Sequence, residues 1–172
     1  MSQQVRSVRA VVGCLGLAAS VLSWEPSAAA DGGAAPPAQP ANAPTTPAQR
    51  AQSAPKGTLK NPYNPGQESI VAQGHELFQS YSCSGCHGGT GGGGMCPPVN
   101  GEVWFYGLED DTLFRLVTLG SLGMDKAGFS HLGGPGLQMP PFGEIIKSDD
   151  EVWKILTWIR SVYKGDPKKK FW

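Results

Sequence analysis

The sequence predicts an all-α domain over residues 61–172, and the periodicity of its apolar residues carries this prediction. Apolar side chains recur at helical spacing in 70–81, 113–117 and 152–162, so each stretch presents one apolar face. Residues 148–151 read Ser-Asp-Asp-Glu, a capping box with acidic residues in the first turn of the last helix. No internal repeat is visible, and we therefore expect a single folded domain.

The boundaries of the first and last predicted helices follow from their capping residues. Asn64 is the expected N-cap of the first helix, Pro65 takes its first helical position, and Gln67 is the capping-box partner. We expect this helix to run directly into Cys83. The last helix is predicted to extend from the capping box to about Lys164.

Gly74 interrupts the apolar stripe of the first helix, at a cost of about 1 kcal/mol relative to alanine. A glycine at this position indicates that another helix crosses there at short distance. Ile155 and Trp158 of the last helix are the expected partners of Gly74 and Phe78, because a bulky ring on one helix meets a gap on the other. The neighbouring His75 is interpreted as a surface or edge histidine.

A shorter helix is predicted between these two, over residues 112–119. Asp110 or Asp111 is the expected cap, and Gly120 is expected to end the helix. Residues 121–138 are rich in glycine and are expected to be irregular.

The chemistry of the chain is indicated by residues 83–87, which read Cys-Ser-Gly-Cys-His. This C-x-x-C-H motif attaches haem: Cys83 and Cys86 add to the two vinyl groups, and His87 becomes the proximal axial ligand of the iron. A zinc site would need a second pair of ligands, and a redox dithiol would need a βαβ setting. The sequence therefore predicts one covalent haem c.

The loop after this motif is expected to surround the haem. Residues 88–94 are almost all glycine, which lets the backbone pass close to a flat ligand, whereas a phosphate loop would need Gly-Lys-Ser/Thr after a strand. Pro97 or Pro98 is placed to offer its carbonyl to the second nitrogen of His87. Trp, Phe and Tyr at 104–106 are interpreted as haem-pocket packing.

Met139 is the predicted sixth ligand of the iron. It follows the glycine-rich stretch and precedes Pro140 and Pro141, which restrict the backbone of its loop. Met124, His131 and an open site remain alternatives. A His/Met haem has no free position for substrate and a raised potential, which suits electron transfer. No Ser-His-Asp set or suitable pair of acids is present, and we do not expect an enzyme.

The first 30 residues are typical of a Sec signal peptide. Arg6 and Arg9 precede an apolar run over 11–22, and small residues before Asp31 offer a cleavage site. The run is too short to span a membrane, so we expect a periplasmic protein without a stable membrane anchor.

Residues 31–60 are rich in Ala and Pro, with little aliphatic bulk, and are predicted to form a disordered linker before the domain at 61–172. The chain has 14 basic and 14 acidic residues, which does not favour nucleic acid as a partner. Of the 4 cysteines, Cys96 alone remains after loss of the signal peptide and attachment of haem, so no disulfide within the chain is expected.

The order of these features resembles class I cytochromes c: a helix with Gly and Phe, C-x-x-C-H, a proline loop, Met-Pro and a terminal aromatic helix. Asn-Pro-Tyr at 61–63, Gly-Gly-Met at 93–95 and Tyr-Lys-Gly-Asp-Pro at 163–167 are similar to cytochrome c-L and its relatives. The resemblance implies that His87 is the proximal ligand, Met139 the distal ligand, and that the carbonyl of Pro97 holds His87.

Cytochromes of that group accept electrons from pyrroloquinoline quinone (PQQ) methanol and alcohol dehydrogenases. The resemblance thus implies a periplasmic one-electron carrier that passes electrons to a downstream cytochrome or terminal oxidase. Two alternatives remain open. One is a haem subunit of a larger oxidase or dehydrogenase complex, with the linker and Cys96 serving assembly, and the other is an open-site haem enzyme or sensor.

Overall fold

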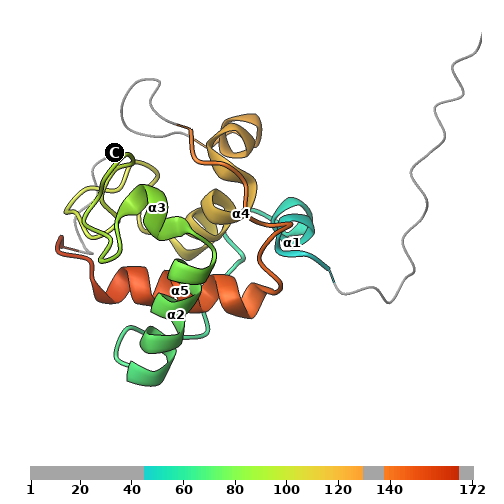
Figure 1. The fold of residues 1–172 in the computed structure, drawn as a ribbon. Helices are drawn as coiled ribbons and strands as arrows, with labels where there is room; N and C mark the ends of the chain where they lie inside the picture. The colour runs from blue at the N-terminus through green and yellow to red at the C-terminus, as the bar shows by residue number, and fades with distance from the viewer. Residues whose placement is uncertain (1–44, 130–137, 167–172) are drawn as a thin grey trace, which may run out of the picture. The chain divides into compact units, whose positions relative to one another are not determined.

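The computed structural model describes residues 45–129 and 138–166, which lie in one compact unit, 40–172. Figure 1 shows the helices in these ranges: α1 (Pro47–Ser53), α2 (Glu68–Ser80), α3 (Cys83–His87), α4 (Asp110–Lys126) and α5 (Asp149–Ser161). The same ranges contain no strand, which confirms the predicted all-α class. None of these helices is long and apolar enough to cross a membrane. The predicted signal peptide lies outside the described residues.

The predicted crossing of the first and last helices is confirmed. A Cβ atom on Gly74 of α2 would lie 2.0 Å from the carbonyl oxygen of Lys154 and 2.9 Å from Cβ of Trp158, both on α5. The ring centroids of Phe78 and Trp158 are 4.4 Å apart, and Ile155 beside them is buried. Only glycine lets the two backbones approach this closely, and Figure 1 shows α2 lying across α5.

The hydrophobic core is built around α5. The predicted apolar face is buried at Val152, Ile155, Leu156, Trp158 and Ile159, while Val162 is half-buried; Trp153, which was not predicted, is buried as well. The same cluster includes Phe78 of α2, Cys83 of α3, and Leu113, Phe114 and Val117 of α4. α2, α3 and α4 therefore share one core with α5.

The first helix begins and ends differently from the prediction. α2 starts at Glu68, because Asn64 forms a turn: its Oδ1 accepts a hydrogen bond from the N–H of Gly66 at 3.0 Å. The side chain of Gln67 still accepts from the N–H of Asn64 at 2.8 Å, so half of the capping box is present. α2 ends at Ser80 and does not run directly into α3, since Ser82 has the left-handed φ of 60°.

The N-terminus of α4 also departs from the prediction, because no aspartate caps it. Glu109 holds the N-cap position without a side-chain hydrogen bond. Asp111 is buried inside the first turn and bonds Arg115 at 2.8 Å, so a tertiary ion pair replaces the expected cap. Gly120, with φ of 67°, ends the regular helix as predicted, but helical turns resume beyond it as far as Lys126.

The beginning of α5 matches the prediction more closely. Ser148 accepts a hydrogen bond from the N–H of Glu151 at 3.3 Å. The Glu151 carboxylate accepts from the N–H of Lys147 at 3.1 Å and from the hydroxyl of Tyr81 at 2.6 Å, which ties the start of α5 to the end of α2. The helix ends at Ser161, earlier than predicted.

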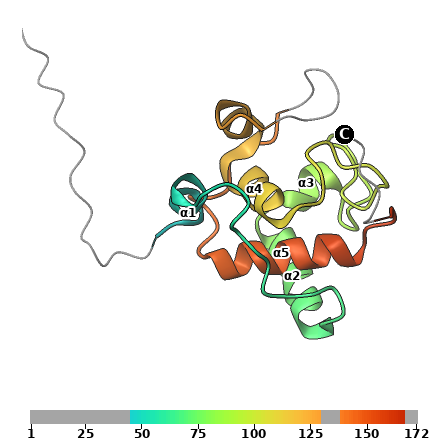
Figure 2. The ribbon, with the colours of Figure 1, turned by 180° about the vertical axis from the view of Figure 1, so that it is seen from behind.

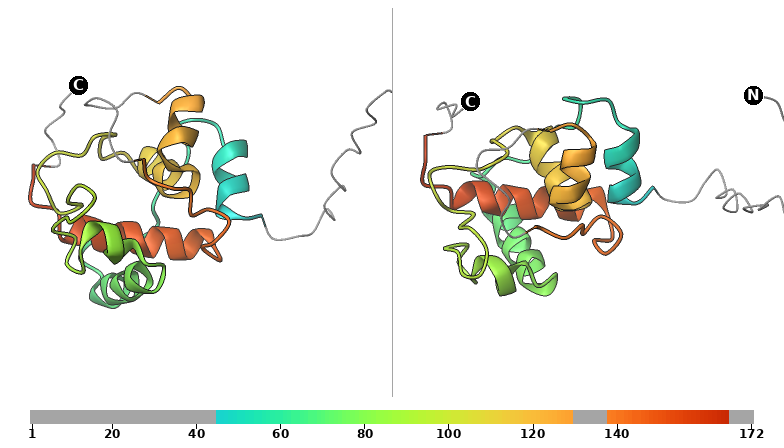
Figure 3. Two further views of the ribbon diagram at one scale, coloured as in Figure 1. Left: turned by 45° about the horizontal axis from the view of Figure 1, so that its top comes forward. Right: turned by 90° about the horizontal axis from the view of Figure 1, so that it is seen from above.

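The predicted disordered linker is wrong for residues 45–60. Thr46 and Gln49 form a complete capping box, with bonds of 3.3 and 3.0 Å, at the start of α1. Ala51 and Leu59 are buried in the core cluster. Figures 2 and 3 show α1 beside α4. Small alanines look like a linker in the sequence, but here they allow close helix packing, and the folded domain includes residues from 45 onward.

A buried arginine joins this segment to α4. Arg115 donates hydrogen bonds to Asp111 and to the carbonyl oxygens of Ala51, Ala54 (2.9 Å) and Pro55 (3.1 Å). Burial by itself would raise the pKa of the Asp111 carboxyl. Hydrogen bonds from Arg115 and from backbone N–H groups outweigh that effect, so the pKa lies below its ordinary value.

We predict that Trp158→Ala lowers the free energy of unfolding by about 3–5 kcal/mol, because it removes the ring that fills the gap at Gly74. Urea unfolding followed by circular dichroism measures the effect. Phe105→Ala is the matched control, since that ring is 45% exposed, and a change within about 0.5 kcal/mol is expected. A loss below about 1 kcal/mol for Trp158→Ala would contradict the close crossing.

We predict that Asp111→Asn destabilises the protein by about 3–5 kcal/mol at pH 7, because it leaves the Arg115 charge buried without a partner. A carboxyl whose folded pKa is lowered contributes its stability above the unfolded pKa of about 3.9, and loses it as the pH falls through the folded pKa. The difference between variant and wild type should therefore shrink below about pH 4. Urea unfolding across pH tests this, with Glu76→Gln on the exposed face of α2 as control.

Candidate haem site

The two cysteines of the C-x-x-C-H motif lie on one face of α3, because residues three apart in a helix are neighbours. Cys83 is 8% exposed and belongs to the core cluster, whereas Cys86 is half-buried. Burial raises the pKa of the Cys83 thiol to about 11, so this thiol is protonated at neutral pH. One sulfur therefore points into an apolar interior and the other lies at its border.

The predicted hydrogen bond between His87 and a proline carbonyl is present. Nδ1 of His87 lies 2.7 Å from the carbonyl oxygen of Pro97. A carbonyl oxygen can only accept, so Nδ1 carries the hydrogen, and in the neutral ring Nε2 then keeps a lone pair. This arrangement sets the orientation of the ring and makes Nε2 the nitrogen that can bind a metal.

The glycine-rich loop brings Pro97 to this position by folding back over α3. The N–H of Gly93 donates to the carbonyl of His87 at 2.8 Å, and the N–H of Cys96 donates to the carbonyl of Cys86 at 3.1 Å. Gly88 has a φ of 76°, and a Cβ atom there would lie 2.6 Å from the carbonyl oxygen of Gly93. Glycine at this turn is thus required for the loop to return.

Two further contacts fasten the loop to the core. Trp104 is buried, donates from Nε1 to the carbonyl of Val99 at 3.0 Å, and packs against Tyr163 with centroids 4.9 Å apart. Phe105 is 45% exposed, and its packing against the haem stays a prediction. On the other side, the half-buried His75 stacks on Trp158 at 4.6 Å, and its Nε2 lies 2.9 Å from the carbonyl of Gly89.

Met139 is half-buried and packs against the core cluster that contains Cys83. Its backbone is held by a single residue after the kink of α4: Ser121 Oγ accepts from the N–H of Met139 at 3.1 Å, and the N–H of Ser121 donates to its carbonyl at 3.0 Å. A Cβ atom on Gly120 would lie 2.5 Å from the Met139 oxygen and 2.8 Å from Pro141 N. The absent side chain of Gly120 thus makes room for the Met-Pro-Pro backbone.

The other candidates for the sixth ligand are placed differently. Met124 is fully buried in α4 but is not part of the core cluster around Cys83, and Met95 is 67% exposed. His131 lies outside the described residues. Met139 is therefore the methionine that borders the same core as Cys83.

Sequence reasoning missed Ser121, for which no sequence pattern gave a signal, and interpreted Gly120 only as the end of a helix. It also missed the contribution of Arg115, since a lone arginine within a helix usually lies at the surface.

These residues fit a covalently bound haem. The donor atoms are an imidazole nitrogen with a free lone pair and a thioether sulfur, the pair found in haem proteins that transfer electrons. Met139 packs against the large apolar cluster that contains Cys83, and such a cluster suits a flat apolar ring.

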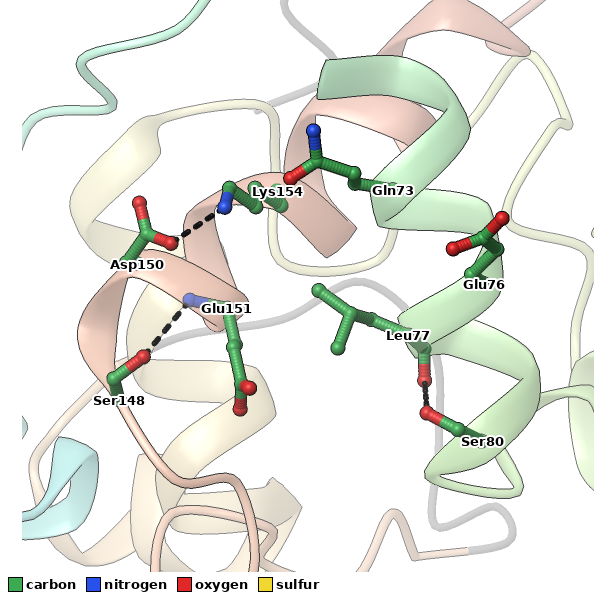
Figure 4. Close-up of a pocket in the computed structure, with 8 residues that line it drawn as sticks. All are labelled: Gln73, Glu76, Leu77, Ser80, Ser148, Asp150, Glu151 and Lys154. Carbon is green, nitrogen blue, oxygen red and sulfur yellow. Dashed lines mark hydrogen bonds and ion pairs between the residues drawn. The ribbon is translucent and has the colours of Figure 1, made fainter. Parts of the chain in front are cut away.

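A separate surface cavity of 470 Å³ opens between α2 and α5 (Figure 4), away from the predicted haem residues. It is lined by Gln73, Glu76, Leu77, Ser80, Ser148, Asp150, Glu151 and Lys154. Its polar groups largely bond one another, as in the ion pair of 2.8 Å between Lys154 and Asp150. The cavity therefore shows no group that calls for a ligand.

Comparison with known families supports the same chemistry. Residues 69–159, which include α3, α4 and most of α2 and α5, match the family described as cytochrome c oxidase, cbb3-type, subunit III. The chain belongs to this family. It is therefore a c-type cytochrome with covalently bound haem c, in the class of electron carriers, and the single C-x-x-C-H motif corresponds to one haem.

The chain is also similar to cytochromes c-L. It is 31% identical over 105 residues to cytochrome c-L of Methylorubrum extorquens, covering 61% of this chain and 46% of that protein. The chain thus spans about half the length of this curated relative. The crystal structure of cytochrome cL from Methylophaga aminisulfidivorans is 27% identical, covers 59% of this chain and 58% of that one, and has a TM-score of 0.45. Cytochrome cL from Hyphomicrobium denitrificans has the same identity and TM-score, covering 74% and 65%.

Proposed function

We propose that this c-type cytochrome is a periplasmic one-electron carrier whose haem is bound by Cys83 and Cys86, with His87 and Met139 as axial ligands. The hydrogen bond from His87 to the carbonyl of Pro97 is the observation that carries this proposal, because it leaves Nε2 as the free nitrogen.

The proposed ligands His87 and Met139 would determine the redox properties of the bound haem. Bound haem supplies an iron that changes its charge by one electron. The hydrogen bond that His87 donates to the carbonyl oxygen of Pro97 raises the basicity of the imidazole ring. The soft thioether of Met139 favours the ferrous state and raises the potential. If His87 and Met139 held the iron, no coordination position would be left for substrate, and the bound haem would supply electron transfer without bond chemistry.

The proposed electron donor is a PQQ-dependent methanol or alcohol dehydrogenase. The similarity to cytochrome c-L of Methylorubrum extorquens and the tripeptides at 61–63 and 93–95 support this choice. A reduced quinone cofactor holds two electrons and one haem accepts one, so two successive encounters are needed. The signal peptide proposed for residues 1–30 delivers the protein to the periplasm, where a downstream cytochrome or terminal oxidase receives the electrons.

Exposed apolar residues on the loop that carries Pro97 and on the segment that carries Met139 support a docking surface. Met95, two residues before Pro97, is 67% exposed, and Pro140 and Pro141 beside Met139 are exposed as well. Brief encounters between redox partners use small, partly apolar surfaces, since a larger contact would slow release.

The second candidate is a haem subunit held in a larger oxidase complex. The description of the matching family, which names a subunit of a cbb3-type oxidase, favours it. In that case the protein should co-purify with other oxidase subunits, whereas a diffusible carrier should elute from periplasm at the size of one chain.

We predict that Met139→Ala abolishes the far-red absorption band of ferric His/Met haem, lowers the potential and admits carbon monoxide to the ferrous form. Loss of the thioether opens the sixth position, and spectroscopy and redox titration measure the three effects. Met124→Leu is the matched control and should keep the band. A Met139→Ala protein that retains the band and excludes carbon monoxide would show that another residue binds the iron.

We predict that a purified PQQ alcohol dehydrogenase with its substrate reduces the wild-type cytochrome. Met95→Lys should raise the KM for the cytochrome about tenfold without changing its potential, because a charge in the docking surface costs about 1.4 kcal/mol of binding. Ile145→Lys, which changes another exposed apolar residue (60%), should leave the KM unchanged. If a chemical reductant reduces the cytochrome but the dehydrogenase does not, the proposed donor is wrong. The assignment of the haem ligands would be unaffected by that result.

A further inference from the structure

We propose that residues 45–60, the N-terminal clamp, hold the methionine segment (139–143) against α4, and that Arg115 and Asp111 are positioning residues for the sixth ligand. This inference rests on the proposed function, in which Met139 binds the iron. The clamp lies outside the matching family region, which begins at residue 69.

The methionine segment is bonded to the end of the first part of α4. The N–H of Phe142 donates to the carbonyl of Val117 at 3.0 Å, and the N–H of Gly143 donates to the carbonyl of Thr118 at 3.0 Å. The kink at Gly120 turns the next N–H groups of the helix away, so these carbonyls need other donors. The segment provides them.

The start of the clamp holds the same segment from its other side. The N–H of Ala48 donates to the carbonyl of Gly143 at 3.2 Å, and Thr46 Oγ1 donates to the carboxylate of Glu144 at 3.1 Å. A Cβ atom on Gly143 would lie 2.7 Å from Cβ of Ala48, so the contact admits no side chain. Gly143 is thus bonded to α4 through its N–H and to α1 through its carbonyl.

The end of the clamp is attached to α4 by the buried pair. Arg115 is 4% exposed and reaches the carbonyls of Ala54 and Pro55, which follow the last turn of α1 and lack helical partners. Asp111 accepts from the N–H of Leu59 at 3.2 Å. A buried charge without its partner is costly, so Arg115 and Asp111 are stable inside the protein only while they stay paired with each other and with the end of the clamp.

Both attachments meet on one turn of α4. Arg115 precedes Val117 and Thr118, whose carbonyls bind the methionine segment, by only two and three residues. The clamp therefore connects the turn that carries these carbonyls to the segment itself. Beyond these bonds, the backbone of Met139 is held by Ser121. Release of the clamp should loosen the methionine before it unfolds the helices.

Two variants of the haem-loaded full-length protein test the clamp. Gly143→Ala pushes α1 away without altering any charge, and Arg115→Gln removes the bonds at the other end. Gly66→Ala, in an exposed turn where the new Cβ would lie 3.1 Å from the Asn64 side chain, and Lys126→Gln, on an exposed lysine of α4, are the matched controls. The temperature at which the far-red band disappears is compared with the midpoint of helix unfolding, and carbon monoxide binding to the ferrous form is timed.

In both variants we expect the band to disappear below the midpoint of helix unfolding and carbon monoxide to bind about tenfold faster, which corresponds to 1.4 kcal/mol lost from the closed state. In wild type and controls the two temperatures should coincide. If Arg115→Gln does not fold, Gly143→Ala decides the question alone.

A clamp with only a structural role would shift both temperatures together and leave carbon monoxide binding unchanged, and that result would overturn the inference. A wild-type protein without the band would instead overturn the assignment of Met139, and the clamp with it. A normal wild-type band that both variants leave unaffected overturns the clamp alone.

Discussion

The contact of α2 with α5 at Gly74 is the constraint on which the rest of the structure depends. The backbones meet so closely that a single methyl group would overlap the carbonyl of Lys154. Phe78 and Trp158 fill the space beside this contact and form the centre of the core. Because α3 follows α2 after a two-residue break, the crossing also determines where Cys83 enters that core.

From this point the two sides of the haem site are built by different means. The histidine side is local, since one glycine-rich loop returns over α3 and brings Pro97 to His87. The methionine side is assembled from distant parts of the chain. A kink at Gly120 accommodates Met139, Ser121 bonds its backbone, and α1 supports the far side of the segment. Such a division suits the proposed electron carrier, in which the proposed ligands His87 and Met139 would have to stay in place while the charge of the iron changes.

The errors in the predicted helix ends have a common cause. Asn and Asp are residue types that favour caps, so Asn64 was expected to cap one helix and Asp110 or Asp111 another. In the structure Asn64 forms a turn instead, and Asp111 bonds a buried arginine. The local preferences of Asn and Asp for caps indicate roughly where a helix begins. Tertiary contacts determine which residue takes the cap position and what the Asn or Asp side chain bonds instead.

The sequence by itself determined the chemistry and the main helices of this protein. The chemistry and the helices follow from local patterns: the cysteine spacing, the adjacent histidine, the small residue at 74 and the apolar periodicity of α5. Each can be recognised from neighbouring residues alone, and the structure agrees with it. Only the tertiary structure decided that residues 45–60 are folded, that Arg115 is buried and that Gly120 receives the methionine segment. These features depend on hydrogen bonds between residues far apart in the chain, and alanines and a single arginine carry no local pattern that reveals such partners.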